Sequence, residues 1–128
     1  MNELLDGVNW LAVIVGFVVA FIIGAIWYSP KLFGAKWAEG VGVDINESSG
    51  PAIMPLVVQA VGTFLLSWLV GITAAANALL TILLIMLTII VLMVAGGLFS
   101  QKSRYAIVTE ASYVLVMVVV MIIVQGIF

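Results

Sequence analysis

The chain has 128 residues, of which 66% are hydrophobic and 8% are charged, and its formal net charge at pH 7 is -2. Soluble domains are roughly half apolar and about a quarter charged, so this composition excludes a soluble globular fold. The sequence contains no Cys and no His, which excludes a thiol nucleophile, a disulfide framework and a zinc or haem site built on those ligands. Four basic residues against six acidic ones give no basic surface, so we expect no nucleic-acid partner.

An apolar run over residues 8–28 is predicted to be the first membrane-spanning helix. About 20 residues at a rise of ~1.5 Å each are enough to cross a hydrocarbon core of ~30 Å. Within this run Gly16, Ala20 and Gly24 recur every fourth residue, a pattern that lets a neighbouring helix approach closely. We therefore predict a helix-packing seam along these three residues. The alternative is that Gly and Ala are simply common in membrane helices.

The segment 29–51 changes character and reads as a membrane boundary. Trp and Tyr prefer the headgroup layer, and Lys prefers its cytoplasmic side. Ser29 can cap a short second helix and Pro30 can occupy its first position, so we expect an interfacial helix here. The predicted interfacial anchors are Trp27, Tyr28, Pro30, Lys31, Phe33, Lys36 and Trp37.

Three more apolar runs, 52–73, 78–99 and 105–127, are each long enough to span a bilayer. The sequence thus predicts one all-α membrane domain over residues 1–128, a bundle of four transmembrane helices arranged as two hairpins. All four Lys and Arg residues fall in the first and third connections, which lie on the same side. The positive-inside rule then places both termini outside the cytoplasm, and we expect a multi-pass protein of the bacterial inner membrane.

Each of the last three spans carries one moderately polar stripe. Hydrocarbon cannot satisfy hydroxyl or amide groups, so we expect these stripes to face one another or a partner subunit, leaving Val, Ile and Leu to lipid. The stripes either hold the bundle together by hydrogen bonds between helices or line a solvated path. The candidate intramembrane polar site comprises Gln59, Thr63, Asn77, Thr81, Thr88, Glu110 and Tyr113.

Glu110 is the only charged residue inside a predicted span. Such a residue is a candidate proton relay, ion site or substrate contact. However, it lies six residues beyond Arg104, near enough to the boundary for a basic side chain to reach it. We therefore weigh a structural role, paired with Lys102 or Arg104 or bonded to a Trp27 or Tyr28 group, against a role in transport.

The motifs Asn9-Trp10-Leu11-Ala12, Gly24-Ala25-Ile26-Trp27-Tyr28-Ser29-Pro30, Phe33-Gly34 and Trp37 resemble the N-terminal signature of an uncharacterised bacterial family of small four-span membrane proteins. The resemblance resumes at Glu110-Ala111-Ser112-Tyr113, where the family pattern is Asn-Ala-Gly-Tyr. It implies a four-span fold and supplies no activity. Glu110 stands at the Asn position, which favours a polar contact that Asn could also make.

Two classes of function follow. The leading hypothesis is a small channel or transporter for an ion or solute, formed as a homo-oligomer because four short spans enclose little volume alone. The alternative is a non-catalytic structural or accessory protein that binds other membrane components. We expect no enzyme, no catalytic residues, no metal site and no cofactor, since the spans contain neither His, Cys nor paired carboxylates.

Overall fold

The computed structural model describes residues 2–29, 31–42 and 53–128, and these residues form helices, turns and connections without a strand. Pro30 and residues 43–52, which belong to the predicted interfacial segment, lie outside the described residues. The helices of the described residues are α1 (Asn2–Leu5), α2 (Trp10–Trp27), α3 (Gly34–Val41), α4 (Ile53–Ala75), α5 (Leu79–Phe99) and α6 (Arg104–Ile127).

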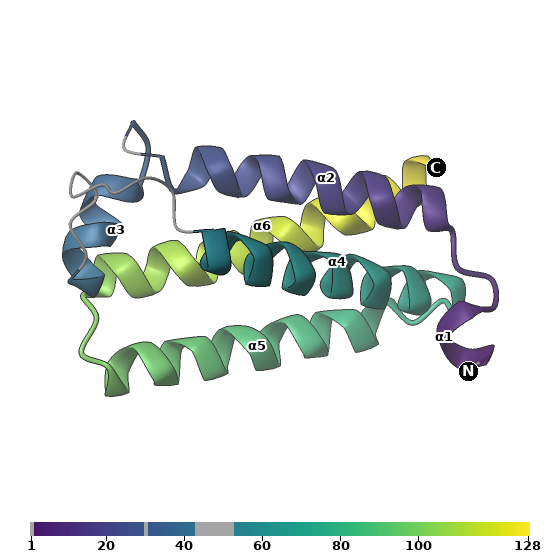
Figure 1. Cartoon of the computed structure of the whole chain (residues 1–128). Helices are drawn as coiled ribbons and strands as arrows, with labels where there is room; N and C mark the ends of the chain where they lie inside the picture. Colours follow the sequence, from purple (N-terminus) through teal and green to yellow (C-terminus); the bar gives the residue numbers. More distant parts are fainter. Residues whose placement is uncertain (1, 30, 43–52) are drawn as a thin grey trace.

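Four of these helices, α2, α4, α5 and α6, are 18 to 24 residues long and apolar enough to cross a membrane. This confirms the predicted all-α class with four apolar helices. In lipid every backbone donor and acceptor must be satisfied within the segment, so an apolar run of this length has to become a helix. Both ends of the chain lie at one end of the bundle, and α3 and the α5–α6 connection, which carry basic residues, lie at the other (Figure 1).

The helix ends are set by local chemistry. Asn9 and Ser103 cap α2 and α6, each accepting a hydrogen bond at 3.1 Å from the backbone N–H three residues later. Asn77 and Gln101 follow α4 and α5 with φ of 54° and 60°, the left-handed conformation that commonly ends a helix. The amide of the next residue then donates back into the helix. The Ala78 amide donates to the Thr73 carbonyl at 2.7 Å, and the Lys102 amide donates to the Gly97 carbonyl at 2.9 Å.

Helix α6 is the centre of the bundle and contacts α2, α3, α4 and α5. Its residues Val114, Met117, Val118 and Met121 are buried in the core. Helix α5 is much less buried than α6, because Ile82 and Gly97 are its only buried residues. Most of its side chains therefore face away from the protein.

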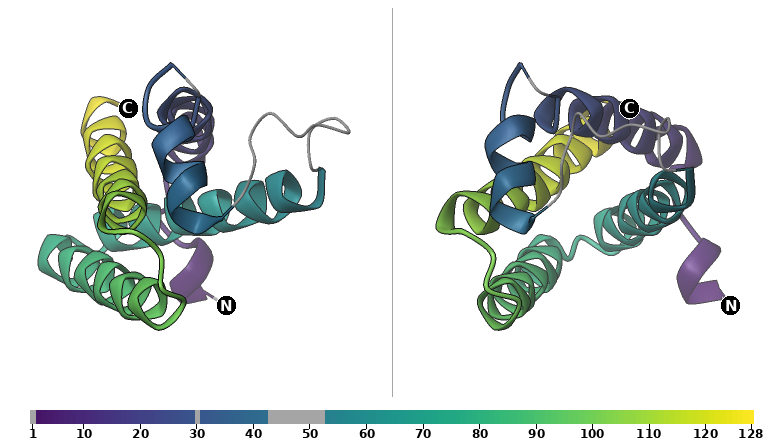
Figure 2. Two further views of the ribbon diagram at one scale, coloured as in Figure 1. Left: turned by 90° about the vertical axis from the view of Figure 1, so that its left-hand side faces the viewer. Right: turned by 60° about the vertical axis from the view of Figure 1, so that its left-hand side comes forward.

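Helix α4 packs against the bundle over only part of its length. Residues 53–59 are exposed, and the first buried residue is Thr63. Figure 2 shows the start of α4 lying away from α2 and α6. Three residues of this diverging part, Pro55, Leu56 and Gln59, line a cavity at the end of the bundle that carries the basic residues.

The short helix α3 begins later than the sequence predicts. The expected first residue, Pro30, lies outside the described residues. The expected cap, Ser29, is wrong, because the N-cap is Phe33 and the Ser29 carbonyl accepts hydrogen bonds from the amides of Leu32 and Gly34 in the preceding turn. The resulting turn brings Gly34 so close to the carbonyls of Tyr28 and Ser29 that a Cβ would overlap them. The helix therefore begins at Gly34, where the chain emerges from this turn.

Helix α3 is tied to α6 by the backbone, since the Ser103 amide donates to the Gly40 carbonyl at 3.0 Å. Figure 2 shows α3 at the end of the bundle, next to the first turns of α6. This placement brings the aromatic residues of α3 to the part of α6 that contains Glu110.

Candidate functional site

Glu110 is held by two donors from outside its own helix. The Trp37 indole Nε1 donates to Glu110 Oε2 at 2.9 Å, and the Lys102 ammonium lies 3.1 Å from both carboxylate oxygens. The Glu110 side chain is 14% exposed and that of Lys102 is 31% exposed. Charge-assisted hydrogen bonds of this kind are the stronger ones in proteins, so the carboxylate is well held near the end of the bundle.

Among the partners expected for Glu110, Lys102 is the one that pairs with it in the structure. The Trp27 indole donates instead to the Thr109 carbonyl at 3.0 Å. Trp37 was predicted only as an interfacial anchor, and its bond to a residue 73 positions away depends on the turn that returns α3 to α6. No sequence pattern indicated that turn.

Three aromatic rings lie together beside the carboxylate. The ring of Tyr28 is 5.0 Å from that of Trp37 and 5.5 Å from that of Tyr113, both edge to face. The Tyr113 hydroxyl donates to the Ala20 carbonyl at 2.8 Å, which fixes its ring across the bundle. The predicted anchors Tyr28 and Trp37 thus lie against the predicted polar residues Glu110 and Tyr113.

These residues line a cavity of about 520 Å³, which we call the aromatic cavity. It lies between the diverging start of α4 and helices α2, α3 and α6, with one residue from α5. Its wall is mostly apolar, and its polar groups come from a few residues only. The lining residues are Phe21, Gly24, Ala25, Tyr28, Trp37, Pro55, Leu56, Gln59, Met93, Glu110 and Tyr113.

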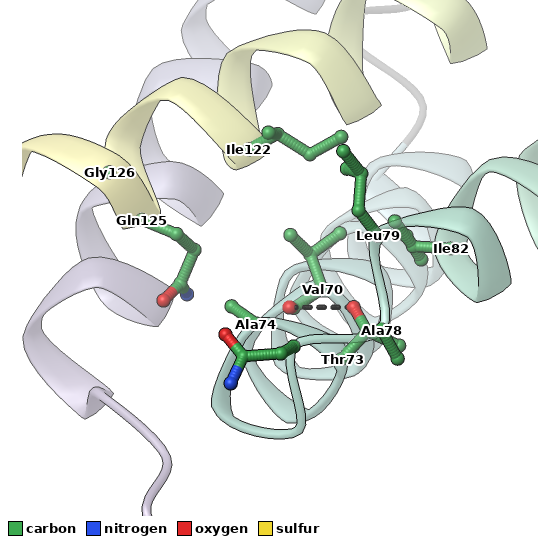
Figure 3. Close-up of a pocket in the computed structure, with 10 residues that line it drawn as sticks. Val70, Thr73, Ala74, Ala78, Leu79, Ile82, Ile122, Gln125 and Gly126 are labelled. Carbon is green, nitrogen blue, oxygen red and sulfur yellow. Dashed lines mark hydrogen bonds between the residues drawn. The ribbon is translucent and has the colours of Figure 1, made fainter.

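A second cavity of about 300 Å³ lies at the opposite end of the bundle, and we call it the amide cavity (Figure 3). Its polar lining residues are Thr73, Asn77 and Gln125, and the hydroxyl of Thr73 already donates to the Val70 carbonyl at 2.9 Å. Gln125 is not among the residues predicted from the sequence, although an amide in the last apolar run is a signal that could have indicated it.

The predicted polar stripes do not all face inward. Thr63 is buried and donates to the Gln59 carbonyl at 2.7 Å, while Gln59 is exposed. Thr81 and Thr88 lie on the outer face of α5, so they do not face another span of the same chain. For these two threonines, contact with a partner subunit stays a prediction.

The predicted seam residues lie on the inward side of α2. Gly16 and Ala20 are buried, and a Cβ at Gly16 would lie 3.0 Å from the Ser67 hydroxyl. Gly24 is closer still to its neighbour, because a Cβ there would overlap the Tyr113 hydroxyl. Ser67, which is not among the predicted residues, donates to the Val13 carbonyl at 2.7 Å and joins α4 to α2.

The other predicted anchors surround the same end of the bundle. Phe33 packs against Trp27 with tilted rings whose centroids are 4.9 Å apart, and the Lys36 ammonium lies 5.4 Å from the centre of the Tyr105 ring. Lys31 is exposed in the turn between α2 and α3. The described residues contain no group of three or more acidic side chains that could hold a metal ion.

Comparison with known proteins gives a family and no activity. No curated protein and no solved structure matches the chain. One family model, described as "Protein of unknown function (DUF1761)", matches residues 11–126. The match covers the residues that line both cavities and all of the four apolar helices except Trp10 and Ile127. The chain therefore belongs to this family of unknown function, in agreement with the resemblance of its N-terminal motifs to small four-span membrane proteins.

Proposed function

We propose that this membrane protein is non-catalytic and binds a small amphiphilic component of the membrane in the aromatic cavity. The observation that carries the proposal is the cavity itself. Its volume of about 520 Å³ falls within the roughly 300–1,000 Å³ of known ligand pockets, and like them it joins an apolar wall to a few polar groups. An amphiphile matches this distribution, with its chain against Phe21, Leu56 and Met93 and its head beside Glu110.

The position of the cavity supports entry from the bilayer. Residues 53–59 of α4 are exposed where the helix diverges, and Pro55, Leu56 and Gln59 line the cavity. A ligand that moves within the membrane can reach this space from the side. We place it at the cytoplasmic boundary of a bacterial inner membrane, with both termini outside, because the four basic residues lie at this end of the bundle.

Packing between the two cavities favours binding over conduction through one chain. The core between them includes Met117, Val118 and Met121, which are at most 6% exposed. Glu110 is paired with Lys102 and does not stand free in a path. These features support the accessory class of function over a pore within the single chain.

Transport by a homo-oligomer is the second candidate function. It is favoured by α5, which buries only Ile82 and Gly97 and presents Thr81 and Thr88 on its outer face. A second subunit against this face would bring two sets of hydroxyls together. A path formed in this way would lie between subunits and would leave the core of each subunit packed.

The test of binding uses Trp37 as a reporter within the cavity. Changing Trp10, Trp27 and Trp68 to Phe leaves Trp37 as the only indole, and a neutral maltoside with a bromine on its alkyl chain is titrated into the purified protein in nanodiscs. We expect saturable quenching of Trp37, because the brominated chain binds next to the ring. A matched protein that keeps only Trp68, at the opposite end of the bundle, should show quenching that does not saturate.

A cavity-filling variant completes the experiment. Ala25 lines the cavity, so Ala25→Phe should abolish the saturable quenching, whereas Val18→Phe on the exposed face of the same helix should preserve it. Non-saturable quenching of Trp37 in the parent protein by this maltoside and by its brominated alkylammonium counterpart would contradict the proposal. Ion or solute flux in liposomes that persists in Ala25→Phe would instead support the oligomeric transporter.

A further inference from the structure

The aromatic cavity has one charged group, and that group is negative. Among the described residues that line the cavity, Glu110 alone carries a charge, while Gln59 and the hydroxyls of Tyr28 and Tyr113 are neutral. A carboxylate in surroundings of low dielectric attracts a cation more strongly than it would in water. The head of a ligand beside Glu110 is therefore expected to be positive.

The rings beside Glu110 favour the same kind of ligand. Phe21, Tyr28, Trp37 and Tyr113 all line the cavity, and the Tyr28 ring contacts those of Trp37 and Tyr113 next to the carboxylate. The face of an aromatic ring is negative, and groups of such rings bind quaternary ammonium ions in many proteins. Rings and carboxylate at one end of an apolar cavity thus match an alkylammonium ion.

Lys102 shows that the carboxylate accepts an ammonium group. Its Nζ lies 3.1 Å from both oxygens of Glu110, and its side chain is more exposed than that of its partner. Lys102 lies in the connection before α6, so its flexible side chain can turn towards water when another cation arrives. Trp37 Nε1 would keep its hydrogen bond to Glu110 during this exchange.

The amide cavity offers a contrast within the same molecule. Its described lining contains neither a charged nor an aromatic residue, and its polar groups are a hydroxyl and two amides. It has no feature that selects a cation. The two cavities therefore differ in the chemistry that they can recognise.

We infer that the aromatic cavity binds an amphiphilic cation whose ammonium group replaces that of Lys102 as the partner of Glu110. This inference rests on the proposed function, because it names the class of ligand for the same cavity. The ammonium could belong to a lipid headgroup that also carries a phosphate, or to a cation without one. Both sources share the ammonium and the alkyl chain that the site recognises.

The test measures the binding of radiolabelled dodecyltrimethylammonium to the purified protein in nanodiscs. Glu110→Gln should weaken binding by about tenfold to a hundredfold, the effect of losing a charge-assisted contact. Lys102→Gln should strengthen it several-fold, since the resident competitor is gone. Opposite effects of the two variants cannot come from a shared loss of folding, and a melting curve for each variant checks this directly.

Matched controls change the same charges elsewhere at this end of the bundle. Glu39→Gln removes an exposed carboxylate of α3, and Arg104→Gln removes a positive charge two residues from Lys102. Both should leave the affinity within about twofold of the parent, because screened surface charges contribute little. If Arg104→Gln strengthened binding as much as Lys102→Gln, the exchange at Glu110 would be wrong.

Competing ligands separate the remaining outcomes. If dodecylphosphocholine competes as well as the simple cation, the ammonium belongs to a lipid headgroup. If dodecylphosphocholine fails to compete, the ammonium belongs to a cation without phosphate. Both results support the inference. Equal competition by dodecyl maltoside or dodecyl sulfate would overturn the inference and leave the proposed function in place. Binding of none of these amphiphiles would contradict the proposed function itself.

Discussion

At the scale of the residue, Glu110 has two separable properties, its hydrogen bonds and its charge. The hydrogen bonds from Trp37 and Lys102 join α3 and the α5–α6 connection to α6. A neutral amide can accept a hydrogen bond from Trp37 but cannot form an ion pair. Stability and ligand binding should therefore respond differently to substitution at this position.

We expect Glu110→Gln and Glu110→Asn to melt close to the parent protein, whereas Glu110→Ala should lower the free energy of unfolding by about 1–2 kcal/mol. Alanine leaves the indole donor of Trp37 without a partner, and hydrogen bonds between membrane helices have about this value. Thermal unfolding in neutral detergent, followed by circular dichroism, measures the difference. An alanine variant as stable as the glutamine variant would show that the contact does not stabilise the fold.

At the scale of the element, close approach by small residues determines how α2 packs. Gly16 lies against Ser67 of α4 and Met121 of α6, and Gly24 lies against Tyr113 of α6. Lipid tails are as apolar as the helices, so helices in a membrane associate through close packing rather than through the hydrophobic effect. Gly16 and Gly24 are therefore expected to be the positions of α2 that are most sensitive to substitution by a larger residue.

Gly24→Leu and Gly16→Leu should each destabilise the protein by about 1–3 kcal/mol, the usual cost of excess volume in a packed site. Gly24→Leu should have the larger effect, because it also displaces the Tyr113 hydroxyl from the Ala20 carbonyl. Val18→Leu and Val19→Leu are the matched controls on the same helix and should change little. The measurement is the retention of folded protein after heating in detergent, and equal tolerance at all four positions would remove the seam from the account of packing.

The sequence predicted the four apolar helices because length and hydropathy alone decide whether a segment can span a membrane. It could not predict which face of α5 turns inward. The hydroxyls of Thr63, Thr88 and Thr109 each donate to a carbonyl four residues earlier in the same helix. A hydroxyl satisfied within its own helix has no need of a neighbour, so its position in the sequence carries no information about packing.

The candidate site was predictable only in part. Glu110 stood out as the charged residue of an apolar run, and Lys102 as a basic residue near it in the chain. Their association with Trp37 depends on the turn at Ser29 and Gly34, which forms because a glycine can lie against two carbonyls. A contact of this kind follows from backbone geometry that composition and periodicity do not report.

At the scale of the whole molecule, the distribution of charge implies an orientation. Lys31, Lys36, Lys102 and Arg104 belong to connections and helix ends on one side of the bundle, while both termini lie at the other (Figure 1). Short loops with such an asymmetry are the condition under which the positive-inside rule works best.

The chain has no Cys, so a single introduced Cys reports its own position without ambiguity. We expect Lys36→Cys to be protected from a membrane-impermeant maleimide in intact cells and Phe128→Cys to react with it. Both should react after the cells are permeabilised. The reverse pattern would invert the orientation and move the aromatic cavity to the outer side of the membrane.

Helix α5 buries two residues, and one of them, Gly97, lies against Ile107 of α6. Most of its other residues are exposed, so in a bilayer that face would meet acyl chains wherever no second subunit covers it. The thickness of the bilayer and the packing of its chains then contribute to the free energy of the fold as directly as a substitution in the core does. Stability measured for this protein is a property of the chain and its solvent together, and each value belongs to the lipid in which it was obtained.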